Sequence, residues 1–168
     1  MTERALIVEH IPSLRRYARA LLGVRGDADD LVQESLERAL SRWHLFSPDR
    51  PLRPWLFAIM HNQFISGRRR DARRGGGEPL DAEDARLSVP ATQDARVALH
   101  ELADALAELP AEQREVVLLV GLEGLSYAEV AEILSIPLGT VMSRLSRGRE
   151  RLRELTREGG RPRLRRVK

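Results

Sequence analysis

The chain has 168 residues, of which 42% are hydrophobic, enough for one ordinary domain or two small ones with modest cores. It contains no cysteine, which excludes disulfides, thiolate metal sites and a cysteine nucleophile. The N-terminus lacks the long apolar region of a signal peptide, and no run of about 18 apolar residues could span a bilayer. We therefore expect a cytoplasmic protein without a membrane partner. Leu, Ala, Glu and Arg dominate and no long alternating segment suggests a strand, which favours an all-α fold.

The first half predicts three helices. Apolar residues at helical spacing over 7–21 predict an amphipathic helix that glycines end. A second helix opens at Asp27, and acidic residues in its first turn favour the helix dipole. A third runs roughly over 52–74, with Pro54 in its first turn, where proline is tolerated. These helices predict a first small domain over 1–74.

The second half is separated from the first by residues 75–94, which are acidic and rich in Gly and Pro and predict a flexible linker. A fourth helix and a fifth, which begins at Pro110, then precede two more helices in a domain over 95–156. Residues 157–168 predict a disordered basic tail. The expected architecture is therefore two small helical domains joined by a linker.

Residues 125–155 predict two helices around a tight turn. Ser126 and Glu129 have the spacing of a capping box, in which each side chain satisfies a free backbone donor near the helix start. Pro137 then ends the first helix and begins the second. In the second helix one apolar stripe faces the rest of the domain; it comprises Val141, Leu145, Gly148, Leu152 and Leu155.

The opposite face and flanks of this last helix predict a DNA-reading surface, with base contacts near the N-terminal end and phosphate contacts by arginines. From Arg144 to Lys168 there are 11 basic and 3 acidic residues, a net charge of +8, whereas the whole chain carries only +3. The rest of the chain must therefore carry −5, so positive charge is concentrated at this end. The predicted DNA-binding residues are Thr140, Met142, Ser143, Arg144, Ser146, Arg147, Arg149 and Arg151.

The order of the motifs resembles that of the extracytoplasmic-function (ECF) group of bacterial RNA polymerase sigma factors. The segment DADDLVQESLERAL, residues 27–40, is similar to the family's region 2.2, and RPWLFAIMHNQFISGRRR, residues 53–70, is similar to its promoter-melting segment. Residues 106–134 and 136–155 are similar to region four. The resemblance covers nearly the whole chain and implies a subunit that binds core polymerase, recognises promoters and helps to open the DNA.

The resemblance also implies site residues in the first half. The helix that begins at Asp27 would dock on the clamp helices of the polymerase's largest subunit, where acceptors would meet arginines. The residues implied for this contact are Asp30, Leu31, Gln33 and Glu34. The third helix would open the minus-ten element, and the residues implied there are His61, Asn62, Arg68, Arg69 and Arg70. Trp55 and Phe64 fall at core spacing, so we interpret them as packing residues.

The resemblance implies further partners and leaves other points open. The family reads the minus-thirty-five element with its last helix and contacts the polymerase flap, and an anti-sigma factor is a possible partner. Met142 stands where the family usually has Lys or Arg, and Gly148 where it commonly has Ala, so the promoter sequence is not predicted. No cofactor, metal or catalytic residue is expected.

Two other functions are compatible with parts of the sequence. An autonomous helix-turn-helix regulator would bind an operator without polymerase, usually as a symmetric dimer, but the long first domain would then have no role. A small nuclease could use Asp27, Asp30 and Glu34 to hold a metal ion, although no histidine lies nearby and acids are common at helix starts. The sequence favours the sigma factor over both.

Overall fold

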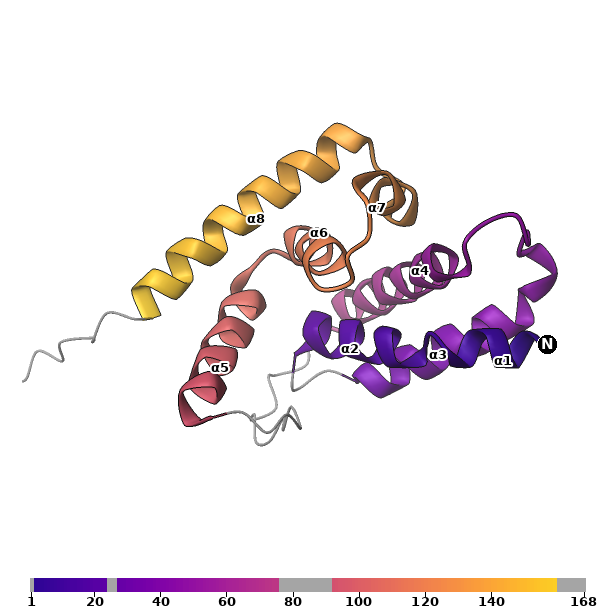
Figure 1. Cartoon of the computed structure of the whole chain (residues 1–168), viewed down its shortest axis with the longest axis horizontal. Coiled ribbons are helices and arrows are strands. Elements are labelled where there is room, and N and C mark those ends of the chain that lie inside the picture. The colour runs from indigo at the N-terminus through magenta and orange to yellow at the C-terminus, as the bar shows by residue number, and fades with distance from the viewer. Residues whose placement is uncertain (1, 24–26, 76–91, 160–168) are drawn as a thin grey trace, which may run out of the picture.

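The computed structural model describes residues 2–23, 27–75 and 92–159, and within these ranges it is all-helical, as predicted (Figure 1). Helices α1 to α4 form the first half, and α5 to α8 form the second. The elements are α1 Glu3–Val8, α2 Ile11–Leu22, α3 Ala28–Ser41, the 3-10 helix η1 Trp43–Leu45, α4 Leu52–Arg73, α5 Gln93–Glu108, α6 Ala111–Gly121, α7 Tyr127–Leu134 and α8 Leu138–Gly159.

The prediction of a single helix over 7–21 is wrong, because the chain forms two helices there. Helix α1 ends at Val8, and α2 begins at Ile11 with Pro12 in its first turn. Proline lacks the N–H that a continuous helix would need at this point, but it fits the first turn of a new one. The second and third predicted helices are confirmed as α3 and α4.

The second half differs from the prediction mainly at its ends. Helix α5 begins at Gln93, within the predicted linker, and residues 76–91 of that linker lie outside the described residues. Helix α8 continues to Gly159, three residues into the predicted tail, and residues 160–168 lie outside the described part. The α8 helix is thus longer than the apolar stripe alone indicates.

The two halves pack against each other. Helix α4 lies against α7, and α2 lies against α5 and α6, as the neighbouring ribbons in Figure 1 show. The buried apolar residues of both halves form one cluster that includes Leu14, Phe57 and Met60 from the first half and Val116 and Val130 from the second. The two predicted domains therefore contact each other in this structure.

The helix-turn-helix has the predicted local structure. The Ser126 amide donates to the Glu129 carboxylate at 2.8 Å, and the Glu129 amide donates to the Ser126 hydroxyl at 3.2 Å, which completes the capping box. Ser135 ends α7 in the left-handed conformation, with φ of 53°. Gly148 lies where α8 crosses α6, and a Cβ built there would meet the Val117 Cγ2 at 2.7 Å. The glycine thus permits a close helix crossing.

Gly148→Ala should destabilise the protein, by about 1 kcal/mol in the free energy of unfolding. Alanine has a helix propensity about 1 kcal/mol better than glycine, but the stiff Val117 side chain would have to move, and overpacking costs roughly 1–3 kcal/mol. The matched control is Gly139→Ala on the same helix, where no atom lies within 4 Å of the new Cβ. Urea unfolding measures both, and a Gly148→Ala variant more stable than Gly139→Ala would contradict the crossing argument.

Tyr17→Phe should stabilise the protein by about 1 kcal/mol. The Tyr17 ring packs edge-on against Phe57 at 5.2 Å, but among the described residues its buried hydroxyl has no hydrogen-bond partner. Burial, reinforced by Glu115 and Glu123, raises the pKa of Tyr17 well above its ordinary value of 10.0. Stability is therefore lost as the pH rises above about 10, and phenylalanine should reduce this loss. Thermal unfolding at neutral and at alkaline pH measures both effects, with Tyr127→Phe as the exposed control. If the Tyr17 hydroxyl had a hydrogen-bond partner, Tyr17→Phe would raise the melting temperature at neither pH.

Candidate nucleic-acid and polymerase interfaces

Helix α8 presents the predicted reading face to the outside. Val141, Leu145 and Gly148 are buried, and Leu152 and Leu155 are half-buried, so the apolar stripe faces inward. The predicted DNA-binding residues lie on the remaining surface. Met142, Ser146, Arg147, Arg149 and Arg151 are exposed, and Thr140, Ser143 and Arg144 are half-buried.

Acidic neighbours divide the arginines of α8 into two groups. Arg151 and Arg153 each pair with a glutamate three residues away, at 3.2 and 3.0 Å. Arg144 lies 3.5 Å from Glu112 of α6, and its side chain is only 25% exposed. The described residues place no acidic group within ion-pair distance of Arg147 or Arg149. These two are the arginines most available for an external anion.

A shallow cleft of about 240 Å³ lies between the start of α7 and the middle of α8. Tyr127 comes from α7, and the other lining residues, Met142, Leu145, Ser146, Arg149 and Arg153, come from α8. Met142 is more than half exposed at this cleft, so an apolar group stands among the polar residues of the reading face.

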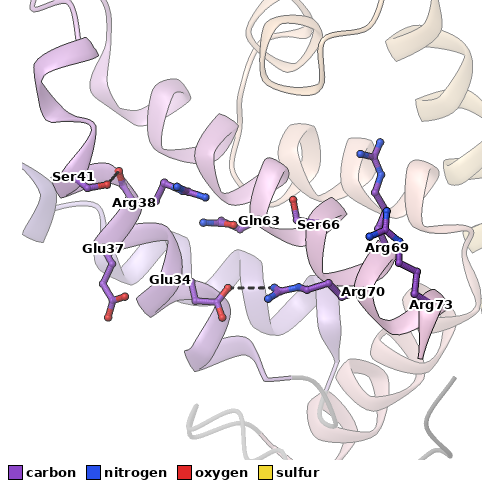
Figure 2. Close-up of a pocket in the computed structure, with 9 residues that line it drawn as sticks. All are labelled: Glu34, Glu37, Arg38, Ser41, Gln63, Ser66, Arg69, Arg70 and Arg73. Atoms are coloured by element: carbon purple, nitrogen blue, oxygen red, sulfur yellow. Dashed lines mark hydrogen bonds and ion pairs between the residues drawn. The ribbon is translucent and has the colours of Figure 1, made fainter. Parts of the chain in front are cut away.

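A second and larger groove, of about 690 Å³, lies between α3 and α4 (Figure 2). Its α4 wall carries Arg69, Arg70 and Arg73, and its α3 wall carries acidic residues together with Arg38. Figure 2 shows Glu34 and Arg70 pointing toward each other across the groove, with 3.8 Å between the carboxylate oxygen and the guanidinium nitrogen. The complete lining is Glu34, Glu37, Arg38, Ser41, Gln63, Ser66, Arg69, Arg70 and Arg73.

The groove brings together residues that the sequence placed in two different sites. Asp30, Gln33 and Glu34, predicted for polymerase docking, are exposed on α3, and Gln33 donates to Glu37 at 3.2 Å. Leu31 is 8% exposed and belongs to the core, so its side chain offers little surface for the expected apolar contact with a partner. The predicted polymerase surface thus adjoins the arginines predicted for DNA.

Among the residues predicted for the minus-ten element, His61 differs from the rest. Asn62, Arg68, Arg69 and Arg70 are exposed, and the Arg68 guanidinium lies 5.7 Å from the centre of the Phe64 ring. His61 instead turns toward the second half, with its Nδ1 2.6 Å from a carboxylate oxygen of Glu115. The second half therefore covers most of this histidine, whose side chain is 16% exposed.

The aromatic residues of the first half pack as expected. Phe64 is buried, and Trp55 packs edge-to-face against Trp43 and at a tilt against Phe46, at ring-centre distances of 6.1 and 5.2 Å. This cluster adjoins the loop over 46–50, where a hydrogen bond from the Ser47 hydroxyl holds the pKa of Asp49 below its usual value. The cluster thus anchors this loop to the start of α4.

Sequence reasoning missed the polar contacts between the two halves. The Glu123 carboxylate, in the turn after α6, accepts hydrogen bonds from Arg16 at 3.0 and 2.8 Å and from Arg53 at 2.7 Å. The hydrogen bond with Glu123 raises the pKa of Arg16. Arg114 of α6 donates to the Leu21 carbonyl at the end of α2, at 2.9 Å. No motif or spacing marks these residues, because their partners are 70 to 107 positions away in the chain.

Comparisons with known proteins agree with this arrangement. Residues 7–61 match the family described as the Sigma2 domain of PhyR, and residues 99–152 match Sigma-70, region 4. The chain is 41% identical over 150 residues to the ECF RNA polymerase sigma factor EcfG of Rhodopseudomonas palustris, covering 89% of this chain and 82% of EcfG. The chain belongs to the ECF family of RNA polymerase sigma factors. This sigma factor is also 39% identical to SigL of Mycobacterium tuberculosis, over 84% of this chain and 81% of SigL.

Solved structures support the same family. Sigma factor RpoE of Bartonella quintana, in complex with the anti-sigma factor NepR, superposes with a TM-score of 0.80 at 32% identity, covering 92% of this chain and 96% of RpoE. CnrH, in complex with the cytosolic domain of CnrY, superposes with a TM-score of 0.68 at 29% identity, over 94% of this chain and 90% of CnrH. A superposition over nine-tenths of this sigma factor includes residues of both halves.

The alternative functions lose support. The chain's membership of a sigma factor family explains why the first half is present. The hypothesis of an autonomous regulator gave this half no role. In the part of the chain that the structure describes, no group of three His, Cys, Asp or Glu side chains could hold a metal ion, so Asp27, Asp30 and Glu34 do not form the cluster that a nuclease would need. None of the described helices is long and apolar enough to span a membrane.

Proposed function

We propose that this sigma factor docks on core RNA polymerase through residues 1–74 and reads promoter DNA with both halves, while performing no chemistry itself. The observation that carries the proposal is the separation of two cationic surfaces, the α8 face around Arg147 and Arg149 and the α3–α4 groove. A tether between two small binding units makes the second contact intramolecular, so two weak contacts act together.

The α8 face has the geometry of a recognition helix in the major groove. Its N-terminal part offers Thr140, Met142 and Ser143 to base edges, and the exposed arginines further along can reach phosphates or guanines. Met142 offers an apolar surface suited to a thymine methyl group. We assign this face to the minus-thirty-five element and the opposite, buried stripe to packing within the second half.

The α3–α4 groove and the exposed surface of α3 beside it would serve two partners. Asp30, Gln33 and Glu34 offer acceptors to arginines of the polymerase clamp helices, while Arg69 and Arg70 offer donors to phosphates of the minus-ten DNA. Asn62 is exposed on the same helix and can pair with an unstacked base edge. The second half would contact the polymerase flap.

An anti-sigma factor is a further proposed partner. The relatives RpoE and CnrH were solved in complexes with NepR and CnrY, and this chain superposes on both across its two halves. Helix α5 carries exposed apolar residues, among them Val97, Leu99 and Leu102, which such a partner could cover.

Gel filtration of the purified chain with bacterial core RNA polymerase at moderate salt tests the proposal. Co-elution, together with weak specific DNA binding by the chain alone, is the expected result. Failure to co-elute with core polymerase from several bacteria, combined with tight specific DNA binding by the free chain, would overturn it in favour of an autonomous regulator.

Arg147→Ala should weaken transcription from a cognate promoter about 5- to 150-fold, the effect of losing roughly 1–3 kcal/mol of base or phosphate contact, and should leave polymerase binding intact. The matched control is Arg157→Ala, an exposed arginine in the last turn of α8. Run-off transcription and co-elution measure the two quantities. Normal transcription by the Arg147 variant would remove this residue from the reading face.

Asp30→Ala combined with Gln33→Ala should lower the affinity for core polymerase about tenfold, because two acceptors for the partner's arginines are lost. Asp29→Ala is the control, since Asp29 is also exposed in the first turn of α3 and its ion pair with Arg19 is long, at 3.9 Å. Fluorescence anisotropy with labelled sigma factor gives the dissociation constants. An unchanged constant for the double variant would refute the docking assignment.

A further inference from the structure

An exposed apolar notch, formed by Tyr127 and Met142, interrupts the polar reading face of α8. Met142 is 52% exposed, Tyr127 at the start of α7 is 38% exposed, and both side chains line the cleft of about 240 Å³ between the two helices. In Figure 1, α8 runs along the outer edge of the second half with its start beside α7. Single exposed apolar side chains are common, but here two from different helices share one cleft. The notch is therefore a feature of the folded helix pair.

The two sides of the notch are held differently. The capping box of Ser126 fixes the first turn of α7, and with it the backbone of Tyr127. Leu145 also lines the cleft and is only 2% exposed, so it lies on the inner side. Met142 is unbranched and has a polarizable thioether, so it can adapt to a small apolar group that enters the notch. One side is thus rigid and the other adjustable.

Polar residues of the same cleft continue the stripe that Met142 begins. Ser146 and Arg149 follow it at helical spacing, and both are exposed. The Ser146 hydroxyl can donate or accept a hydrogen bond. Arg149 lies about 10 Å further along the helix, at 1.5 Å per residue, so its guanidinium approaches a different nucleotide. The cleft thus offers an apolar contact at one end and a cation for a phosphate at the other.

The chemistry of the notch matches one feature of the major groove. Among the unmodified bases only thymine presents a methyl group there, at C5 beside its O4 acceptor, whereas cytosine presents the N4 amino donor. A serine hydroxyl can bond either exocyclic group. Among the described residues that line the cleft, none is acidic, so the cleft offers no carboxylate to accept from cytosine N4. The lining therefore distinguishes pyrimidines by the methyl group and not by the exocyclic group.

We propose that Tyr127 and Met142 make this sigma factor select promoter DNA by the C5-methyl group of one pyrimidine. Thymine supplies this group in unmodified DNA, and 5-methylcytosine supplies it in methylated DNA. Ser146 bonds the exocyclic group of either base, and Arg149 binds a phosphate nearby. The inference rests on the proposed function, because it names the base feature that the α8 face reads. Methylation of a cytosine at this position therefore strengthens binding.

The test begins with the full chain in complex with core RNA polymerase, which selects binding sequences from a duplex library whose random segment can hold a whole promoter. Each thymine of a selected duplex is then replaced in turn by deoxyuridine, by cytosine and by 5-methylcytosine. At one position deoxyuridine should bind about fourfold more weakly than thymine, the effect of exposing one methyl group to water. At that position 5-methylcytosine should bind about fourfold more tightly than cytosine.

Variants of the full chain assign these differences to the notch. Met142→Ala should remove both differences, and Tyr127→Ala, which removes the other side of the notch, should reduce them. The matched control is Leu138→Ala, because Leu138 is a similarly exposed apolar residue of α8, at 49%, that does not line the cleft. This control should keep both differences.

Three results would overturn the inference. They are equal binding of thymine and deoxyuridine at every position, differences that persist in Met142→Ala, and 5-methylcytosine that binds no more tightly than cytosine. If core polymerase does not bind the chain, the same selection is made with the free chain. Methyl differences that depend on Met142 would then leave the inference standing while the proposed function fails, and a selection that enriches no sequence would overturn both.

Discussion

A buried carboxylate at the interface, together with the apolar cluster that both halves share, determines how the two halves are placed. Glu123 lies in a turn with no exposed side-chain surface, and the bonds from Arg16 and Arg53 compensate for its lost hydration. Charge-assisted bonds are directional, so they fix which residues of α2 and α4 face the turn. The packing of α7 on α4, and the inward position of His61, follow from that placement.

This constraint separates the functional surfaces into two groups. The α8 face and the α3–α4 groove carry mostly exposed side chains and are accessible in this structure. His61 lies inside the interface, beside the exposed Asn62 on the same helix. The residues predicted for the minus-ten element are therefore divided between an exposed group and a histidine that contacts the second half.

Much of the local structure was predictable because its causes are local. The capping box at Ser126, the break before Pro137 and the spacing of Val141 and Leu145 each depend on residues within a few positions, and all are confirmed. The break between α1 and α2 was missed because the apolar spacing continues across it, and only Pro12 marks the new helix start. Residues 76–91, predicted as linker, lie outside the described part.

The candidate sites were predictable only in part. Exposure of Arg147 and Arg149 follows from helical periodicity, whereas the burial of Leu31 depends on how α3 packs on its neighbours. The pairs of Glu123 and Glu115 join residues 54 to 107 positions apart, and no periodic pattern encodes such a contact. In the sequence alone, Glu115 and Glu123 cannot be distinguished from charged residues on the protein surface.

The most direct test of the account is small-angle X-ray scattering of the free chain and of a Glu123→Gln variant, which compares their radii of gyration. The account predicts a larger radius of gyration for the variant, because the buried group that joins the second half to α2 and α4 loses its charge-assisted bonds. An unchanged radius of gyration in a folded variant would contradict it.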